Sequence, residues 1–140
     1  MTLLARRDYS RGQLCARLLD KGFAKLDIAP LLDALEQQGV VDDQRYAAML
    51  IRGQIAKGHG PVRIRQTALQ KGLTKETVEM ALAAADCDWV QLAKARALKK
   101  FGADNKGVDA KERARRMRHL SGQGFNYEQI AAALDDDPEA

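Results

Sequence analysis

Apolar residues recur three and four positions apart along most of the chain, which is the spacing of one face of an α-helix. Three glycine pairs punctuate this pattern, and each is followed by an apolar residue six positions after the glycine and a leucine ten positions after it: Gly22-Phe23, Gly72-Leu73 and Gly124-Phe125. The intervals of 50 and 52 residues between the glycines predict a tandem repeat in which each unit is too small to bury its apolar face alone.

The leucines that precede these glycines, Leu19, Leu69 and Leu120, also align if the last unit contains one extra residue. No stretch shows the sustained alternation of β-branched and aromatic residues that a half-buried strand needs. We therefore predict an all-α fold of three tandem three-helix repeats that form an elongated, curved helical array. The predicted units are residues 1–40, with a short first helix, then 41–86 and 87–135, and an acidic C-terminal tail at 136–140.

Polar residues at helix starts locate most of the helices. A short opening segment is expected around Leu3–Arg7, and Ser10 with Gln13 forms a capping box for a helix that runs to about Lys21. Further starts are predicted from cap residues, or from a proline in the first turn, at Asp42, Pro61, Thr74, Asp109 and Asn126.

Pro30 bears on where the last helix of the first repeat begins. Alignment with the other repeats would place the cap at Ala24, which is a poor capping residue and would leave Pro30 inside the helix. A start at Asp27 places Pro30 in the first turn, where proline is tolerated. We predict the later start, with the helix running to about Gln38.

The stretch KGHGPVRIRQTALQKGL, residues 57–73, combines a helix start, a cluster of cations and a stop. Ile64, Ala68 and Leu69 fall at helical spacing, while Arg63 and Arg65 flank them. This pattern predicts a helix that packs on one face and carries positive charge on its shoulders.

Charge is unevenly distributed, although the net charge is only +4. Residues 44–75 contain seven Lys and Arg and no acid, whereas residues 119–140 contain five acids and no Lys or Arg. A basic middle of this length favours a polyanionic partner over a merely solvated face.

Catalytic constellations are missing from the sequence. His59 and His119 lie far apart, there is no G-x-S-x-G turn, and the GHGP segment lacks the Lys-Ser/Thr of a phosphate-binding loop. Cys15 and Cys87 have no partner at metal-ligand spacing, which predicts two reduced thiols and no metal site. We expect a protein that is not an enzyme and needs no cofactor.

Apolar runs stay well below the roughly 20 residues of a membrane span, and the N-terminus lacks the apolar core of a signal peptide. These features predict a cytoplasmic protein. Three aromatic residues that could stack on bases, Tyr46, Trp89 and Phe101, are expected to pack in the core instead.

Three segments of the chain resemble the RecX family of bacterial recombinase regulators. They are LLARRDYSRGQLCARLLDKGF at 3–23, DDQRYAAMLIRGQIAKGHGPVRIRQTALQKG at 42–72 and ARRMRHLSGQGFNYEQIAAAL at 114–134. The resemblance covers nearly the whole chain and keeps the order of the repeats. It departs at Gln123, where a basic residue is common in the family. It implies a protein that binds the RecA recombinase and its nucleoprotein filament, and restrains filament growth, ATP hydrolysis, strand exchange and co-protease activity.

On this interpretation the protein is a monomer that contacts the RecA filament, single-stranded DNA and, secondarily, double-stranded DNA. We hypothesise that the filament or DNA contact uses basic residues on successive helices: Arg52, Lys57, His59, Arg63, Arg65, Lys71, Lys111, Arg115 and Arg118. The alternative is a helix-turn-helix protein that binds duplex DNA, which would require one recognition helix with base-reading residues at its exposed early positions.

Overall fold

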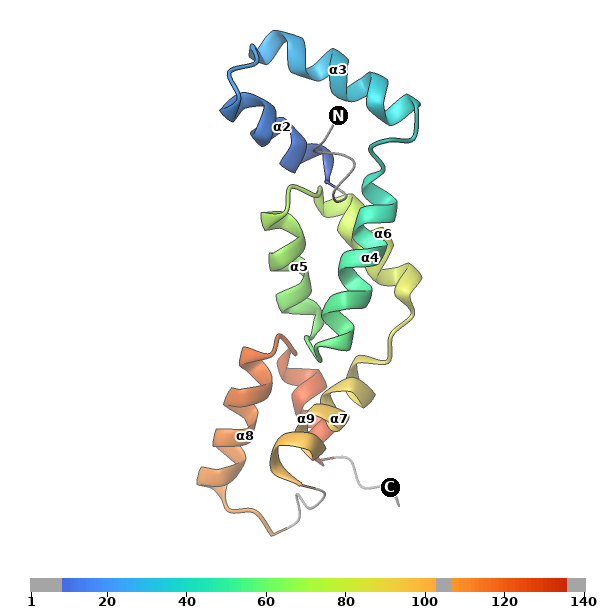
Figure 1. Cartoon of the computed structure of the whole chain (residues 1–140). Helices are drawn as coiled ribbons and strands as arrows, with labels where there is room; N and C mark the ends of the chain where they lie inside the picture. Colours follow the sequence, from blue (N-terminus) through green and yellow to red (C-terminus); the bar gives the residue numbers. More distant parts are fainter. Residues whose placement is uncertain (1–8, 103–106, 136–140) are drawn as a thin grey trace.

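The computed structural model describes residues 9–102 and 107–135, and these ranges contain eight α-helices and no strand. The helices stack into an elongated array with the N-terminal and C-terminal parts at opposite ends (Figure 1). In chain order they are α2 (Arg11–Asp20), α3 (Lys25–Gln37), α4 (Asp43–Ala56), α5 (Pro61–Gln70), α6 (Lys75–Ala85), α7 (Trp89–Phe101), α8 (Ala110–Gly122) and α9 (Tyr127–Asp135). The predicted opening helix around Leu3–Arg7 and the tail at 136–140 lie outside the described residues.

Three separate hydrophobic clusters run along the array. The first lies between α2 and α3, the second among α4, α5 and α6, and the third among α7, α8 and α9. Tyr46 and Trp89 pack against the second cluster and Phe101 packs against the third, as predicted for aromatic residues of the core. The all-α repeat architecture expected from the apolar pattern is therefore confirmed.

The ends of α2, α5 and α8 have the same hydrogen-bond geometry. In each, the residue after the glycine donates its N–H to a carbonyl five positions earlier, in the pattern of a Schellman cap. The accepting carbonyls, with their N···O distances, are Leu18 at 3.1 Å, Ala68 at 3.2 Å and Leu120 at 3.2 Å. Each of these three residues is buried in the cluster of its own unit.

This geometry corrects the predicted repeat register. Leu19 and Leu69, which we aligned with Leu120, are 45% and 50% exposed, whereas Leu120 is fully buried. The equivalent of Leu120 is the residue one position earlier in each of the other units, so no extra residue is needed in the third. The leucine pattern was misleading because an exposed leucine adjoins the core position in the first two units.

The predicted start of α3 is also wrong. The helix begins at Lys25 behind Ala24, which makes no side-chain capping bond, so Pro30 lies inside the helix. Proline cannot donate to the carbonyl four residues earlier, which belongs to Leu26. Leu26 is 90% exposed, so water can hydrate this carbonyl. The other face of α3 is buried in the first cluster, and this packing outweighs the poor cap and the proline.

Most other helix starts follow the predicted local chemistry. The hydroxyl of Ser10 accepts from the Gln13 N–H while the Gln13 side chain accepts from the Ser10 N–H, which completes the capping box. Asn126 and Gln129 exchange the same pair of bonds at 2.8 and 2.9 Å. Pro61 occupies the first helical position of α5, where its missing N–H has no cost.

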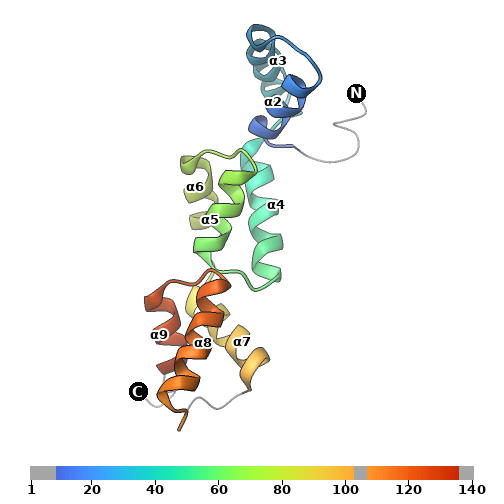
Figure 2. The same cartoon turned by 90° about the vertical axis from the view of Figure 1, so that its left-hand side faces the viewer.

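The central helices α2, α5 and α8 follow one another end to end along one side of the array (Figures 1 and 2). We call the contact of α2 with α5 the first joint and the contact of α5 with α8 the second joint. At the first joint the Ser10 hydroxyl donates to the Lys71 carbonyl. At the second joint the Gly60 N–H donates to the Gln123 carbonyl over 2.8 Å, and the Val62 N–H donates to the Gly124 carbonyl over 2.9 Å.

Glycines allow this close approach at both joints. A Cβ on Gly12 would lie 2.6 Å from the carbonyl oxygen of Gly72, and a Cβ on Gly60 would lie 2.4 Å from that of Gly124. Each joint brings the C-terminal carbonyls of one helix to the N-terminus of another, which aligns their dipoles favourably.

Candidate nucleic-acid interface at the second joint

The second joint brings basic side chains from three helices together. Lys57 ends α4, Arg63 lies in the first turn of α5, and Arg96 comes from the middle of α7. The Arg96 side chain crosses Gly58, where an added Cβ would lie 2.2 Å from its Cδ. Its Nη2 approaches the Gln123 side-chain oxygen at 3.5 Å, and its Nε is buried without a hydrogen-bond partner in the described part of the chain. Arg96 is therefore held across the joint by both shape and polar contact.

His59 stands at the α4 side of this joint. Its Nδ1 lies 2.6 Å from the side-chain oxygen of Gln54, a largely buried polar residue of α4. Burial lowers the pKa of His59 below its usual value, and the positive charges of Arg63, Lys57 and Arg96 lower it further. The imidazole is therefore neutral at pH 7 and surrounded by cations.

His119 is in a similar environment on α8. Its ring meets that of Phe101 edge-on, with 5.4 Å between ring centroids and an interplanar angle of 85°. Burial lowers its pKa, and Lys100, Arg96 and Arg115 add to the effect. Its Nε2 is buried and has no hydrogen-bond partner among the described residues.

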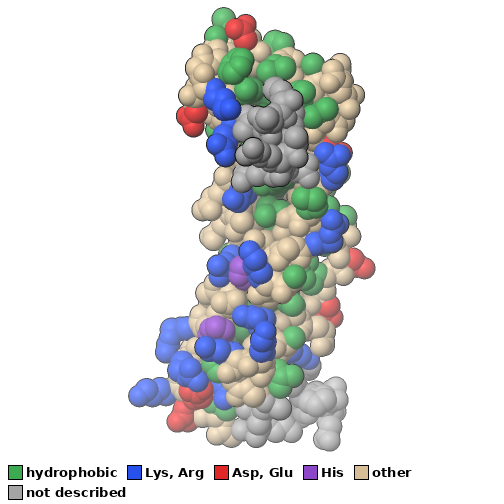
Figure 3. All heavy atoms as spheres, in the orientation of Figure 1, with side chains coloured by type: hydrophobic (Ala, Val, Ile, Leu, Met, Phe, Trp, Pro, Cys, Tyr) green, Lys and Arg blue, Asp and Glu red, His purple; other side chains and the backbone are tan. Residues whose placement is uncertain are grey.

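Arg96 acts electrostatically on both histidines and so connects these two groups of cations. We call the combined surface the junction patch; it consists of Lys57, His59, Arg63, Arg96, Lys100, Arg115 and His119. Figure 3 shows both histidines of the chain on one face, among Lys and Arg side chains near the meeting of the second and third units. The charges that act on either histidine are all positive, so the patch favours an anionic ligand.

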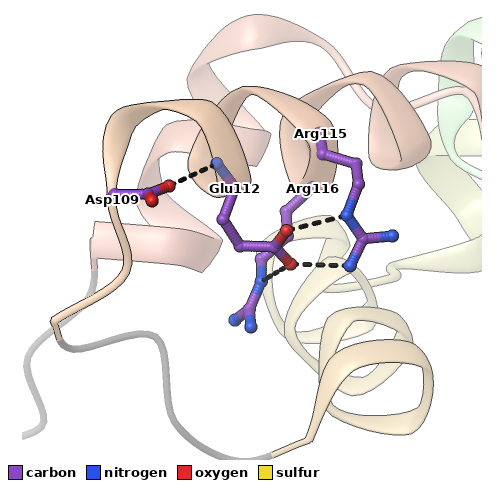
Figure 4. A network of polar contacts seen from close by, with 4 residues as sticks. All are labelled: Asp109, Glu112, Arg115 and Arg116. Atoms are coloured by element: carbon purple, nitrogen blue, oxygen red, sulfur yellow. Dashed lines mark hydrogen bonds and ion pairs between the residues drawn. The ribbon is translucent and has the colours of Figure 1, made fainter.

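Glu112 moderates the positive charge at one edge of this patch. Its backbone N–H is capped by Asp109, and its carboxylate accepts two bonds from Arg115, at 2.6 and 2.8 Å, and one from Arg116 at 3.2 Å (Figure 4). The bonds from Arg115 and then Arg116 lower the pKa of Glu112 to about 2. Both guanidinium groups also lie over the ring of Phe101, at 5.0 and 5.1 Å from its centroid.

The structure separates the predicted contact residues into distinct places. The junction patch contains four of them: Lys57, His59, Arg63 and Arg115. Arg65 instead pairs with Glu79 of α6, with 2.6 Å between Nε and Oε1, and Arg52 lies at a groove between α4 and α6. Lys71 is exposed at the first joint, and Lys111 and Arg118 are exposed on α8, one turn on either side of Arg115.

Sequence reasoning missed three members of the patch: Arg96, Lys100 and His119. A sequence signal for Arg96 and Lys100 was present, because the segment that forms α7 carries several cations outside its apolar face. Their proximity to Lys57 and His59 depends on the second joint, which no local spacing reveals.

Other kinds of site are not found in the described ranges 9–102 and 107–135. No group of three His, Cys, Asp or Glu side chains there could hold a metal ion. No described helix is both long and apolar enough to cross a membrane. Cys15 and Cys87 are free thiols.

Fold and patch together define a helical-repeat protein with a cationic surface patch. Comparison with known proteins gives its family. Residues 42–82 match the description "RecX, second three-helix domain" and residues 86–134 match "RecX, third three-helix domain". Regulatory protein RecX of Shewanella oneidensis is 49% identical over 121 residues, which cover 77% of this chain and 95% of that protein. Regulatory protein RecX of Chromohalobacter salexigens is 42% identical over 132 residues, covering 94% and 86% of the two chains.

Solved structures agree with these sequence matches. A crystal structure of regulatory protein RecX superposes with a TM-score of 0.80 at 25% identity, covering 97% of this chain and 68% of that one. The crystal structure of RecX from Lactobacillus salivarius shares the fold with a TM-score of 0.83 at 18% identity, covering 96% and 89%. The chain belongs to the RecX family of regulatory proteins.

Proposed function

We propose that this chain is a non-enzymatic regulator that binds RecA and its nucleoprotein filament and inhibits the recombinase, ATPase and co-protease activities of that filament. Membership of a family named for regulation supports the regulatory role. RecA is the partner in this proposal because the resemblance of the sequence to the RecX family implies it. In this proposal the protein acts in the cytoplasm as a monomer, within DNA repair, homologous recombination and the SOS response.

The junction patch is the observation that supports contact with the nucleic acid of the filament. Its cations come from α4, α5, α7 and α8, and Figure 3 shows Lys and Arg side chains gathered around the two histidines on one face, which suits the regularly spaced phosphates of a DNA backbone. The patch lacks exposed aromatic platforms, since Phe101 is covered by two guanidinium groups. We therefore propose a contact that follows the backbone of single-stranded DNA, and secondarily of double-stranded DNA, without reading bases.

One assay tests the function directly. ATP hydrolysis by RecA on single-stranded DNA should fall when this protein is added, and the double variant Arg63→Glu/Arg65→Glu should inhibit less while keeping its helical circular dichroism. Full inhibition by the folded double variant would remove these arginines from the contact. An unchanged RecA rate with the unmodified protein would overturn the proposed function itself.

The DNA contact has its own test. If about five phosphates are neutralised, the logarithm of affinity for single-stranded DNA should fall with the logarithm of salt concentration at a slope of roughly −3.5. A response independent of salt would remove the direct DNA contact. A protected site on one defined duplex, without recombinase, would instead support the helix-turn-helix alternative.

A further inference from the structure

An apolar groove of about 730 Å³ lies between α4 and α6. Five alanines and two isoleucines make up seven of its nine lining residues, and the other two are Gln44 and Arg52. None of the nine belongs to α5 or to the junction patch. The Gln44 amide also contacts the sulfur of Met80, a residue that is 62% exposed, so apolar surface continues past the rim.

Small side chains explain why the groove is open. Ala81, Ala84 and Ala85 present only methyl groups along the last part of α6, opposite Ala48 and Ala56 of α4. The chain then leaves α6 through Asp86, whose left-handed backbone (φ 49°) ends the helix and directs the chain to α7. The volume of the groove is within the range of about 300–1,000 Å³ that is usual for ligand sites.

The lining favours a protein segment over nucleic acid as the occupant. A backbone of phosphates needs several cations in a row, and splayed bases need aromatic platforms. Among the described residues that line the groove, Arg52 is the single cation and none is aromatic. An apolar concave surface with one charge fits a protein segment better, because apolar side chains can fill the groove while one carboxylate pairs with the guanidinium.

Arg52 is available for such a pair. Residues 44–75 contain no Asp or Glu, so no acid of its own helix after Asp43 can pair with it. Within the described residues Arg52 is exposed and makes no ion pair, in contrast to Arg65, which Glu79 neutralises. The groove therefore joins an apolar floor to an unpaired positive charge at its edge.

We propose that the α4/α6 groove docks a segment of the protein partner that presents apolar side chains beside an Asp or Glu, with the carboxylate pairing to Arg52. The inference rests on the proposed function, which makes RecA that partner. In this arrangement the junction patch contacts the DNA phosphates of the filament, and the groove contacts the RecA protein. A partner held at both surfaces is bound more tightly than by either one alone.

Matched substitutions in the full chain test the groove. Ala84→Glu places a carboxylate in the groove, where it repels the partner's acid, and Arg52→Glu reverses the charge at the rim. Ala132→Glu on α9 and Lys25→Glu on α3 make the same chemical changes at exposed helical positions elsewhere. Arg52→Lys keeps the charge. Circular dichroism and the urea midpoint identify any variant that is misfolded.

Binding is measured to RecA assembled on a short single-stranded oligonucleotide and, separately, to the bare oligonucleotide. Ala84→Glu and Arg52→Glu should weaken binding to the RecA filament by about tenfold or more. The filament affinities of the two controls and of Arg52→Lys should stay within about threefold of that of the unmodified chain. The affinity of the groove variants for bare oligonucleotide should be unchanged, apart from the general effect of charge seen with Lys25→Glu.

Several results would overturn the proposal. Unchanged filament binding by folded Ala84→Glu and Arg52→Glu would remove the groove from the contact while leaving the proposed function intact. Equal losses on bare oligonucleotide would make the groove a nucleic-acid surface. Sedimentation showing that Ala84→Glu dissociates a dimer would make a second copy of the chain the occupant. Failure of the unmodified chain to bind RecA would reject the proposed function, and RecA as occupant with it.

Discussion

The backbone N–H of Gly60 donates to the carbonyl of Gln123 over 2.8 Å, which joins the start of α5 to the end of α8. The first N–H groups and last carbonyls of a helix have no partner within it. This bond and the neighbouring bond from the Val62 N–H to the Gly124 carbonyl pair two N–H groups at the start of α5 with two carbonyls at the end of α8. Because these N–H groups are used, recognition of an anion at the second joint depends on the side chains of the junction patch.

Gly60→Ala should destabilise the protein by about 1–3 kcal/mol, the usual cost of forcing an extra methyl group into a packed site. The new Cβ would lie 2.4 Å from the Gly124 carbonyl oxygen, and both partners there are backbone. Gly53→Ala is the matched control: nothing lies within 4 Å of its Cβ position, and it should gain about 0.5–1 kcal/mol from helix propensity. Urea unfolding measures both, and equal effects would show that the joint does not limit stability.

Arg63 and Arg65 should differ in their effect on DNA binding, although only one residue separates them. Arg63 lies in the junction patch, whereas Arg65 is held by Glu79 through bonds of 2.6 and 3.3 Å. Arg63→Ala should weaken binding to single-stranded DNA and reduce the magnitude of the salt slope by about 0.7, the value for one phosphate contact. Arg65→Ala should leave the slope unchanged. The reverse ranking in a fluorescence titration would place the contact on the α6 side.

Glu112→Gln should strengthen binding to single-stranded DNA and make its salt dependence steeper. Because the pKa of Glu112 is about 2, its carboxylate is ionised at neutral pH, and the substitution removes a full negative charge from beside Arg115 and Arg116. Glu128→Gln on α9 removes an exposed charge of the same kind and serves as the control. Equal changes for the two variants would mean that net charge alone, and not release of the two arginines, sets the affinity.

Stability should fall as the pH is lowered from 7.5 to 5.5. The pKa values of His59 and His119 are lowered in the folded protein, mainly by burial, so the unfolded chain binds more protons in this range. Stability then rises with pH through the usual histidine pKa near 6.5. Replacing both histidines with Gln should flatten the dependence of the urea midpoint on pH. The affinity for DNA should show the opposite pH dependence and be higher at pH 5.5, because the phosphates attract the charged imidazoles.

Local chemistry made most helix starts predictable from the sequence. Ser10 and Gln13, and likewise Asn126 and Gln129, lie three positions apart, so their capping bonds form whatever the rest of the chain does. The start of α3 could not be predicted in this way, because burial of its apolar face outweighed both the weak cap and Pro30. The glycine period marks the helix ends, but it does not distinguish the exposed Leu19 from the buried Leu18 beside it.

The sequence by itself determined the helical repeat, the basic middle of the chain and the family resemblance, because these depend on composition and on spacings of a few residues. Only the tertiary structure decided which cations act together. The charge of Arg96 acts on His59, and its side chain contacts Gln123 across the second joint, whereas Arg65 is paired with Glu79. Such pairings depend on how separate helices stack. The helix joints include close backbone approaches at glycines far apart in the sequence, and no local pattern of side chains predicts these contacts.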